Sequence, residues 1–366
     1  MNPQTPLAEL ATPALLVDRE RMERNVAAMA SVMGDAGVAL RPHFKTSKCV
    51  EVARRQLDRG AIGFTCSTPA EVGLLQDEGV GDLLWAHQPV GPAKVAFAVA
   101  ALRRGGLMIG LDSVESATPL SEAAGGVPVP FLLDVDTGLG RTGADPERAV
   151  ETAIRLAGLP ALELRGVMTH EGHLGTYGAD RTGLEEAGAR AGRRLAEVAS
   201  AVRAAGLNCP IVSVGSTPGA TSAPFVDGVT EARPGTYVYY DAGQVQLGSA
   251  TLDRCAQTVL TRVVSAERPG TAIVDAGVKA MSSDGLAAGT LGTVCDLTGR
   301  PLADVAFANG NEEHGYLTGP GTSALRVGDL LRVVPNHACG TTNMWSVLHV
   351  VEGDHTVDRW PIRARH

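Results

Sequence analysis

Between about residue 12 and residue 240, short apolar runs alternate with stretches in which apolar residues recur at helical spacing. Residues 19–33 show the three- and four-residue spacing that is typical of a helix burying one face. The apolar runs predict strands at 14–18, 38–45, 61–66, 83–87, 107–112, 130–136, 162–170, 211–216 and 229–235. About eight strands alternating with helices predict a parallel sheet, because parallel neighbours need crossover connections.

The number and spacing of these units favour a closed sheet. About eight units within about 230 residues predict a (β/α)8 TIM barrel, although a doubly wound open sheet would also fit the pattern. After about residue 245, β-branched runs separated by Gly, Pro and Asp predict a smaller, mostly antiparallel β domain. We therefore expect an α/β protein with a barrel at 12–243 and a β domain at 244–366, to which residues 1–11 could also belong.

Composition and charge limit the classes of partner. The 366 residues carry a formal net charge of −8, so the chain has no general attraction for nucleic acid or for an anionic membrane surface. No apolar stretch approaches the roughly 18 residues of a membrane-spanning helix, and no secretory signal pattern is visible. The scattered cysteines indicate reduced thiols rather than a disulfide framework. We expect a soluble, cytoplasmic protein that acts on a small molecule.

Polar side chains follow several of the predicted strands. Lys45, Arg141, His170 and His173 all come at or just after the carboxyl end of a strand. Each of them alone is more often structural than functional. In a barrel, however, the carboxyl ends of all strands lie at one face, where active sites are found. Their joint position therefore indicates a site.

The last two barrel units add groups that suit a phosphate. Ser216 and Thr217 follow one strand, and Arg233, Gly235 and Thr236 follow the next. Backbone N–H groups and hydroxyls in these two loops commonly hold phosphate in barrels. A lysine facing a phosphate across the barrel mouth is the arrangement expected for pyridoxal 5′-phosphate (PLP), whose aldehyde forms an imine with the amine.

Two segments carry a family resemblance. The run TPALLVD at 12–18 and the run RPHFKTSK at 41–48 resemble the fold-type III PLP enzymes, which have alanine-racemase-like barrels. The chain is most similar to the group of D-threonine aldolases, D-serine dehydratases and D-threo-3-hydroxyaspartate dehydratases, over nearly its whole length. The resemblance implies a PLP barrel, a C-terminal β domain and a homodimer. It puts Lys45 in the Schiff-base position, with Lys48 as the rival lysine.

The resemblance also implies roles for three residues around the cofactor. Arg141, in the segment 137–141, is similar to the arginine that reaches the phenolic oxygen of PLP. His170 resembles the histidine that stacks on the pyridine ring. Arg233 resembles the racemase arginine that faces the ring nitrogen, and the residues after it would hold the phosphate. Some aldolases of the group lack that arginine.

The β domain contains a second motif, PNHACG at 335–340. On a strand, His337 and Cys339 would point to the same side, so both could bind one metal ion. The resemblance implies a divalent metal at this position, beside the PLP. In the group, His-x-Cys is typical of dehydratases with zinc, and His-x-Asp is typical of aldolases with manganese-like ions. A thiolate favours the softer ion, so the sequence favours zinc over manganese and a dehydratase over an aldolase.

The leading hypothesis is a lyase that acts on D-3-hydroxy amino acids. In a dehydratase, Lys45 would act as the base and the metal would bind the substrate hydroxyl, giving a 2-oxo acid and ammonia. In a D-threonine aldolase, His173 is the candidate base, and the products are glycine and an aldehyde. An amino-acid racemase would need a second base, which the sequence does not identify. The pattern also allows a non-catalytic PLP carrier or a barrel enzyme without PLP.

Overall fold

The computed structural model describes residues 5–284 and 289–365. The described chain forms two compact units, and each of them is made of several chain segments. The β unit contains residues 5–26, 46–51, 236–284 and 289–363, and the barrel unit contains residues 27–45, 52–235 and 364–365. The chain therefore passes between the units several times. The expected single boundary after residue 243 stays a prediction.

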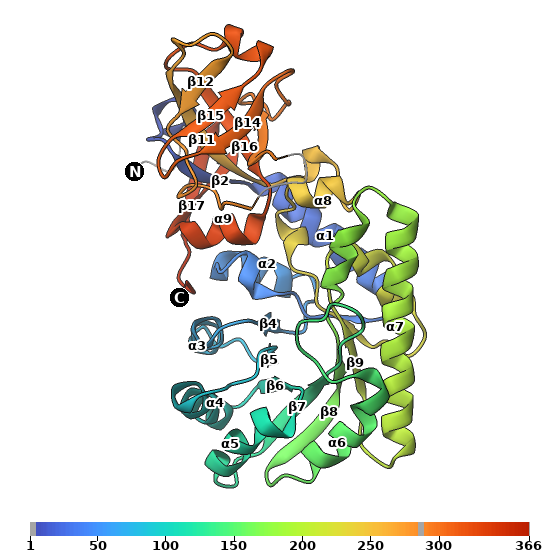
Figure 1. Ribbon diagram of the computed structural model, residues 1–366. Coiled ribbons are helices and arrows are strands. Elements are labelled where there is room, and N and C mark those ends of the chain that lie inside the picture. Colours follow the sequence, from blue (N-terminus) through green and yellow to red (C-terminus); the bar gives the residue numbers. More distant parts are fainter. Residues whose placement is uncertain (1–4, 285–288, 366) are drawn as a thin grey trace. The chain divides into compact units, whose positions relative to one another are not determined.

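The barrel unit contains an eight-stranded sheet in which all neighbouring strands are parallel (Figure 1). An isolated parallel bridge pairs His43 with Thr65, and the N–H of Thr65 donates to the carbonyl of Pro42 at 2.8 Å. These contacts link the two end strands of the row, β3 and β4, so the predicted (β/α)8 architecture is confirmed. The strand order is β3 (Ala39–Leu40), β10 (Glu231–Ala232), β9 (Ile211–Val214), β8 (Leu162–Met168), β7 (Val129–Asp134), β6 (Leu107–Leu111), β5 (Leu83–Trp85) and β4 (Phe64–Cys66).

Helices connect successive barrel strands and cover the outside of the sheet (Figure 1). Between β4 and β9 these are α3 (Pro69–Asp77), α4 (Pro92–Arg104), α5 (Val114–Ala124), α6 (Ala149–Ala157) and α7 (Arg181–Ala204). Two further helices, α1 (Arg19–Ala36) and α2 (Val50–Leu57), each contribute residues to both units. None of the helices in residues 5–284 and 289–365 has both the length and the apolar character needed to cross a membrane.

The β unit is built on a mostly antiparallel sheet, as predicted. Its main path runs β1-β18-β17-β2-β11-β12-β15-β14, and β16 pairs with β11 and β13. The strands are β1 (Thr5–Pro6), β2 (Ala14–Asp18), β11 (Gln257–Ser265), β12 (Thr271–Val274), β13 (Gly292–Cys295), β14 (Ala306–Gly310), β15 (Gly315–Thr318), β16 (Leu330–Pro335), β17 (Val347–Glu352) and β18 (His355–Pro361). Two short helices, α8 (Ala242–Gln246) and α9 (Ala338–Met344), belong to the same unit.

One predicted strand lies in the other sheet. The run 14–18 was expected to begin the barrel, but as β2 it pairs with β11 in antiparallel register and with β17 in parallel register. The residues from Ala14 to Val17 are all buried. A fully apolar run of this kind suits the interior of either sheet, so its pattern predicts a strand without identifying its partners.

Candidate functional site

A pocket at the carboxyl ends of the barrel strands brings together four of the predicted site residues, Lys45, Arg141, His170 and Arg233. Five polar residues that the sequence analysis did not single out also line it: His43, Thr65, Ser67, His87 and Asp134. The pocket therefore combines groups that lie at or after the ends of β3, β4, β5, β7, β8, β9 and β10.

Lys45 is held at the pocket by the residue before it. After β3 the chain passes Pro42, which cannot donate to a sheet, and forms a short 3-10 helix over Phe44–Thr46. Phe44 is fully buried against Phe64, with ring centroids 5.8 Å apart. This anchor fixes the backbone beside Lys45. The rival Lys48 is buried and is not among the residues that line the pocket.

His170 is present as a neutral ring with a defined tautomer. Its Nδ1 lies 2.5 Å from the carbonyl oxygen of Gly215. Because a carbonyl only accepts, Nδ1 carries the proton and Nε2 keeps its lone pair. Burial, and next the charge of Lys45, lowers the pKa of His170 to about 3. The imidazole is therefore uncharged over the ordinary pH range.

Arg233 is a buried cation with donors to spare. Its Nη1 donates to the Ser213 hydroxyl and its Nη2 donates to the Thr169 carbonyl, both at 2.6 Å. Within the described chain these are its hydrogen bonds, so three of the five guanidinium N–H groups remain for a group in the pocket. Burial lowers the pKa of Arg233, and the nearby carboxylates of Glu231 and Glu171 oppose that effect.

Arg141 follows a loop that is shaped by one carboxylate. The side chain of Asp136 accepts the backbone N–H groups of Gly138, Leu139 and Gly140 at 2.8–2.9 Å. Gly140 has a φ of +70°, a left-handed conformation that favours glycine. The loop turns sharply around Asp136 and brings Arg141 to the pocket.

The lining residues fit PLP. Lys45 supplies an amine for the aldehyde, Arg141 and Arg233 supply positive charge and donors, and His170 supplies a neutral aromatic ring. His43 lines the same pocket, and its buried Nδ1 has no hydrogen-bond partner within the described residues. A buried polar atom without a partner is costly, so a polar ligand in the pocket would complete the site.

The predicted phosphate residues are not among the residues that line this pocket. Ser216 and Thr217 follow β9, and Gly235 and Thr236 follow β10, as the sequence indicated. The pocket includes their neighbour Gly215. The Ser216 hydroxyl accepts the N–H of Gly219 at 3.0 Å and so caps the turn after β9.

His173 lies outside the Lys45 pocket. It lines a second cavity of the barrel unit together with Gly138, Tyr177 and Arg190. Its Nδ1 is buried without a hydrogen-bond partner in the described chain, and burial lowers its pKa. His173 and Lys45 therefore line different cavities, and the role of His173 as an aldolase base stays a prediction.

His337 and Cys339 do not lie on a strand, which corrects the expected geometry. Strand β16 ends at Pro335, His337 occupies the position before α9, and Cys339 lies in the first turn of that helix. The two side chains still meet, because Cys339 hydrogen-bonds His337 and thereby raises the pKa of the imidazole to about 10. Sequence spacing predicted the pair correctly but assigned it to the wrong element, because the helix starts within the motif.

Two carboxylates of the β unit hold this pair in place. The Nδ1 of His337 lies 2.6 Å from a carboxylate oxygen of Asp284, which leaves Nε2 for a metal. Asp241 accepts the N–H of Ala338 at 2.8 Å and so fixes the start of α9. The Sγ of Cys339 lies 3.2 Å from the hydroxyl of Thr46.

The donor chemistry of the pair fits a divalent metal with open coordination positions. An imidazole and a thiolate are ligands that bind zinc well, and the side chain of His337 is 48% exposed. Within residues 5–284 and 289–365, no group of three or more His, Cys, Asp or Glu side chains could hold a metal ion. A metal here would therefore take its remaining ligands from water or substrate.

Two family models match the chain. The model described as "Alanine racemase, N-terminal domain" matches residues 17–242. The model described as "Putative serine dehydratase domain" matches residues 256–351. Together they cover the chain that forms most of the barrel and most of the β unit.

Relatives and solved structures agree with these matches. D-threo-3-hydroxyaspartate dehydratase from Delftia sp. (strain HT23) is 36% identical, over 98% of this chain and 98% of that protein. D-threonine aldolase from Arthrobacter sp is 31% identical, over 100% of this chain and 95% of that protein. A solved structure of a D-threo-3-hydroxyaspartate dehydratase, a cysteine-to-alanine variant in the metal-free form, has a TM-score of 0.93 and 35% identity, and the match covers 99% of this chain and 100% of that one.

The barrel with its lysine pocket, the β unit with its His-x-Cys pair and the full-length matches lead to one assignment. The chain belongs to the D-threonine aldolase and D-serine dehydratase group of fold-type III PLP-dependent lyases.

Proposed function

We propose that this protein is a PLP- and metal-dependent dehydratase of D-3-hydroxy amino acids. It would convert the substrate into a 2-oxo acid and ammonia by loss of water and hydrolysis of the remaining enamine. The observation that carries this proposal is the pocket in which Lys45 meets Arg233 and the neutral His170, in a chain that also carries a His-x-Cys pair. The 36% identity to D-threo-3-hydroxyaspartate dehydratase supports the same reaction.

Lys45 has two tasks in this proposal. Its Nζ would hold the cofactor aldehyde, and the same amine would accept the proton from the substrate α carbon. PLP, when bound, supplies the electron sink that allows a bond at that carbon to break. The neutral ring of His170 suits stacking on the pyridine ring, because a charged imidazole would have to be desolvated there.

The remaining cofactor contacts follow from the donors of the barrel. Arg233 keeps N–H groups for the pyridine ring, and Arg141 would reach the phenolic oxygen. We assign the phosphate to the loops after β9 and β10, through Ser216, Thr217, Gly235 and Thr236.

We propose that the metal is held by His337 and Cys339 and that it is zinc rather than manganese, because a thiolate favours the softer ion. The metal-free form of the related dehydratase structure supports a metal in the group. A divalent ion would supply a Lewis acid for the 3-hydroxyl that leaves. Thr46, which contacts Cys339, is bonded to Lys45 in the chain, so a short stretch of backbone connects the two candidate sites.

An aldolase is the second candidate, and the 31% identity to D-threonine aldolase favours it. In that reaction a base removes the proton of the substrate hydroxyl, and the Cα–Cβ bond breaks to give glycine and an aldehyde. The same lysine, cofactor and metal would serve. His173, the candidate base for that reaction, lines a different cavity from Lys45, which favours dehydration. We therefore rank dehydration first.

Product analysis tests the assignment. The purified protein with PLP and zinc is incubated with D-threo-3-hydroxyaspartate, D-serine and D-threonine, with and without a chelator. We expect ammonia with oxaloacetate, pyruvate or 2-oxobutyrate, and loss of turnover on chelation. Glycine with an aldehyde would replace the proposal by the aldolase reaction. Conversion between enantiomers would indicate a racemase, and PLP binding without turnover of any D-amino acid would indicate a carrier.

We also propose a homodimer, on the resemblance to the group, and a cytoplasmic location, on the sequence pattern. Light scattering coupled to gel filtration should give twice the mass of the chain for the active protein. An active monomer would contradict the dimer. Cell fractionation tests the location.

A further inference from the structure

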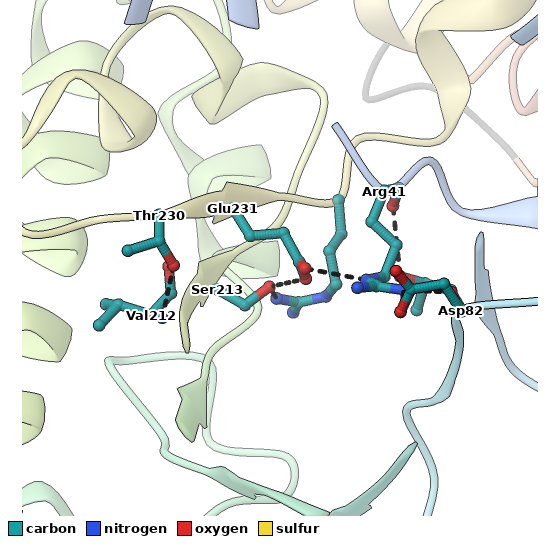
Figure 2. Close-up of polar contacts among 8 residues, drawn as sticks. Arg41, Asp82, Val212, Ser213, Thr230 and Glu231 are labelled. Carbon is teal, nitrogen blue, oxygen red and sulfur yellow. Dashed lines mark hydrogen bonds and ion pairs between the residues drawn. The ribbon is translucent and has the colours of Figure 1, made fainter. Parts of the chain in front are cut away.

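A chain of buried polar groups lies behind Arg233 in the barrel. Figure 2 shows the side chains of Arg41, Glu231 and Ser213 pointing toward one another from neighbouring strand positions. Arg41 Nε donates to one carboxylate oxygen of Glu231 at 2.9 Å, and the Ser213 hydroxyl lies 2.6 Å from the other oxygen. Ser213 also receives the hydrogen bond from Arg233. All four side chains are buried, with exposed fractions of 6% or less.

The direction of each hydrogen bond in this chain is fixed. A guanidinium only donates, so the oxygen of Ser213 accepts from Arg233 and its proton must go to Glu231. Glu231 thus accepts from Ser213 on one oxygen and from Arg41 on the other. Arg41 in turn donates to the backbone carbonyl and the carboxylate of Asp82. The hydroxyl therefore links Arg233 to a carboxylate that Arg41 holds from the other side.

The register of the strands places this chain directly beneath the pocket. Glu231 on β10 is the register partner of Ser213 on β9. Side chains two positions apart on a strand lie on the same face, so Glu231 and Arg233 share the face that reaches the pocket at Arg233. The inward residues of a barrel stack in layers, and Glu231 occupies the layer below Arg233.

Stability alone is a weak reason for such a chain. Removing charged groups from water costs about as much as their attraction returns, so buried ion pairs add little net stability. The chain of hydrogen-bonded groups contains two guanidinium groups and one buried carboxylate, which an apolar core would replace at lower cost. A role in fixing the orientation of one guanidinium explains the arrangement better.

We propose that Ser213 and Glu231, backed by Arg41, are positioning residues that hold the Arg233 guanidinium with its remaining N–H groups toward the cofactor. This inference rests on the proposed function, in which Arg233 contacts the PLP ring. Without the Ser213 hydroxyl, Arg233 keeps only the Thr169 carbonyl as partner and can rotate away from the ring. Cofactor binding then weakens although Lys45 is intact.

A double-mutant cycle on PLP affinity tests the inference. PLP is removed from the full-length protein, and the dissociation constant for re-binding is measured by equilibrium dialysis for wild type, Ser213→Ala, Arg233→Met and the double variant. We expect Ser213→Ala to weaken PLP binding about tenfold, since a hydrogen bond to a charged group is lost. In the Arg233→Met background the same change should weaken binding by less than about twofold, because the two residues are coupled.

Three further variants separate positioning from a general packing effect. Ser213→Thr keeps a hydroxyl and should restore affinity. Glu231→Gln keeps the shape of the side chain but loses the charge. It should weaken PLP binding when Arg233 is present and have no further effect in Arg233→Met. Ser121→Ala deletes another buried hydroxyl of the barrel unit, which donates to the Pro160 carbonyl at 2.6 Å, and should leave PLP affinity unchanged.

The outcomes distinguish this inference from the proposed function. Equal weakening by Ser213→Ala in both backgrounds, or no weakening in either, would overturn the positioning role. Borohydride reduction of wild type should attach the pyridoxyl group to Lys45. If wild type binds PLP at Lys45 but the cycle shows no coupling, only the positioning role fails. If wild type does not bind PLP, both proposals fail.

Discussion

The Lys45 pocket and the His337–Cys339 pair differ in how much of the chain is needed to build each. The pocket takes side chains that follow six strands of the barrel, so it exists only when the sheet has closed. The pair comes from one tripeptide at the start of α9, with Asp284 as support. A site made by one short segment is visible as a motif, whereas a site assembled from many segments depends on the complete fold.

The two sites also shift imidazole pKa values in opposite directions. Burial, and next the charge of Lys45, lowers the pKa of His170 to about 3. Contact with Cys339 raises the pKa of His337 to about 10. The pocket therefore keeps uncharged rings ready for a cofactor, while the pair holds a proton that a metal ion has to displace.

The largest expected effect is the loss of turnover on removal of Lys45, which should leave the metal pair of the β unit intact. Lys45→Ala should lower turnover by about 10³-fold or more, because the attachment point and the base are lost together. Mass spectrometry after borohydride reduction should find no pyridoxyl group on the chain, while zinc content stays normal. Lys48→Ala is the matched control and should keep the tag on Lys45. A tag on Lys48 in wild type would contradict the pocket assignment.

Replacement of Cys339 tests the metal pair, the second site of the comparison. Cys339→Ala should lower dehydration by about a hundredfold or more, since the Lewis acid contributes several kcal/mol, and should leave PLP bound. Turnover and metal content are measured together. Cys295→Ala, a buried cysteine on β13, serves as control and should keep its metal. Cys339→Asp should shift the metal preference from zinc toward manganese. Full activity in metal-free Cys339→Ala protein would end the metal proposal.

Asp284, which holds the imidazole of His337, sharpens the comparison. Its removal should have a smaller effect, confined to metal binding. Asp284→Asn replaces the carboxylate that lies 2.6 Å from His337 Nδ1, and should weaken metal binding by about 10- to 100-fold. Competition with a chelator measures the affinity. Asp296→Asn, in an exposed turn of the same unit, is the control and should leave the metal affinity unchanged. Weaker PLP binding in Asp284→Asn would show that the metal site and the cofactor site depend on each other.

The smallest expected effect concerns pH and the pocket alone. The pKa of His170 is about 3 when folded and near 6.5 when unfolded, so the unfolded chain binds the proton more readily. The resulting stability is complete above pH 6.5 and is lost as pH falls from 6.5 toward 3. In denaturant unfolding of the PLP-free protein, His170→Phe should reduce the slope of stability against pH by up to about 1.4 kcal/mol per pH unit in that range. An unchanged slope would mean that His170 binds its proton equally well in the folded and unfolded states.

Much of the fold could be predicted because periodicity is a local property. The alternation of apolar runs and helical spacing predicted α1 and the succession of barrel strands along the chain. The same reasoning assigned β2 to the barrel, since a fully buried run has no polar face to distinguish one sheet from another. Sequence reasoning also missed β14, β15 and β18, whose short runs are interrupted by Gly, Asn or charged residues.

The site shows the same division. Lys45, His337 and Cys339 were found because each stands in a short, specific motif. His43 stands in the same motif as Lys45 and could have been found there, and Asp134 could have been found as the acidic end of an apolar strand. The link between Glu231 and Ser213 had no local signal, because neither residue belongs to a motif.

By itself, the sequence determined most of the strands and helices, the lysine at the barrel mouth and the proximity of an imidazole to a cysteine sulfur. The tertiary structure alone decided which sheet receives β2, that α9 begins inside the metal motif, and that Arg41 meets Glu231 across 190 positions of chain. The physical reason is that periodicity and motif spacing specify faces and local geometry. Hydrogen-bond partners far apart in the chain are chosen only when the strands pack side by side.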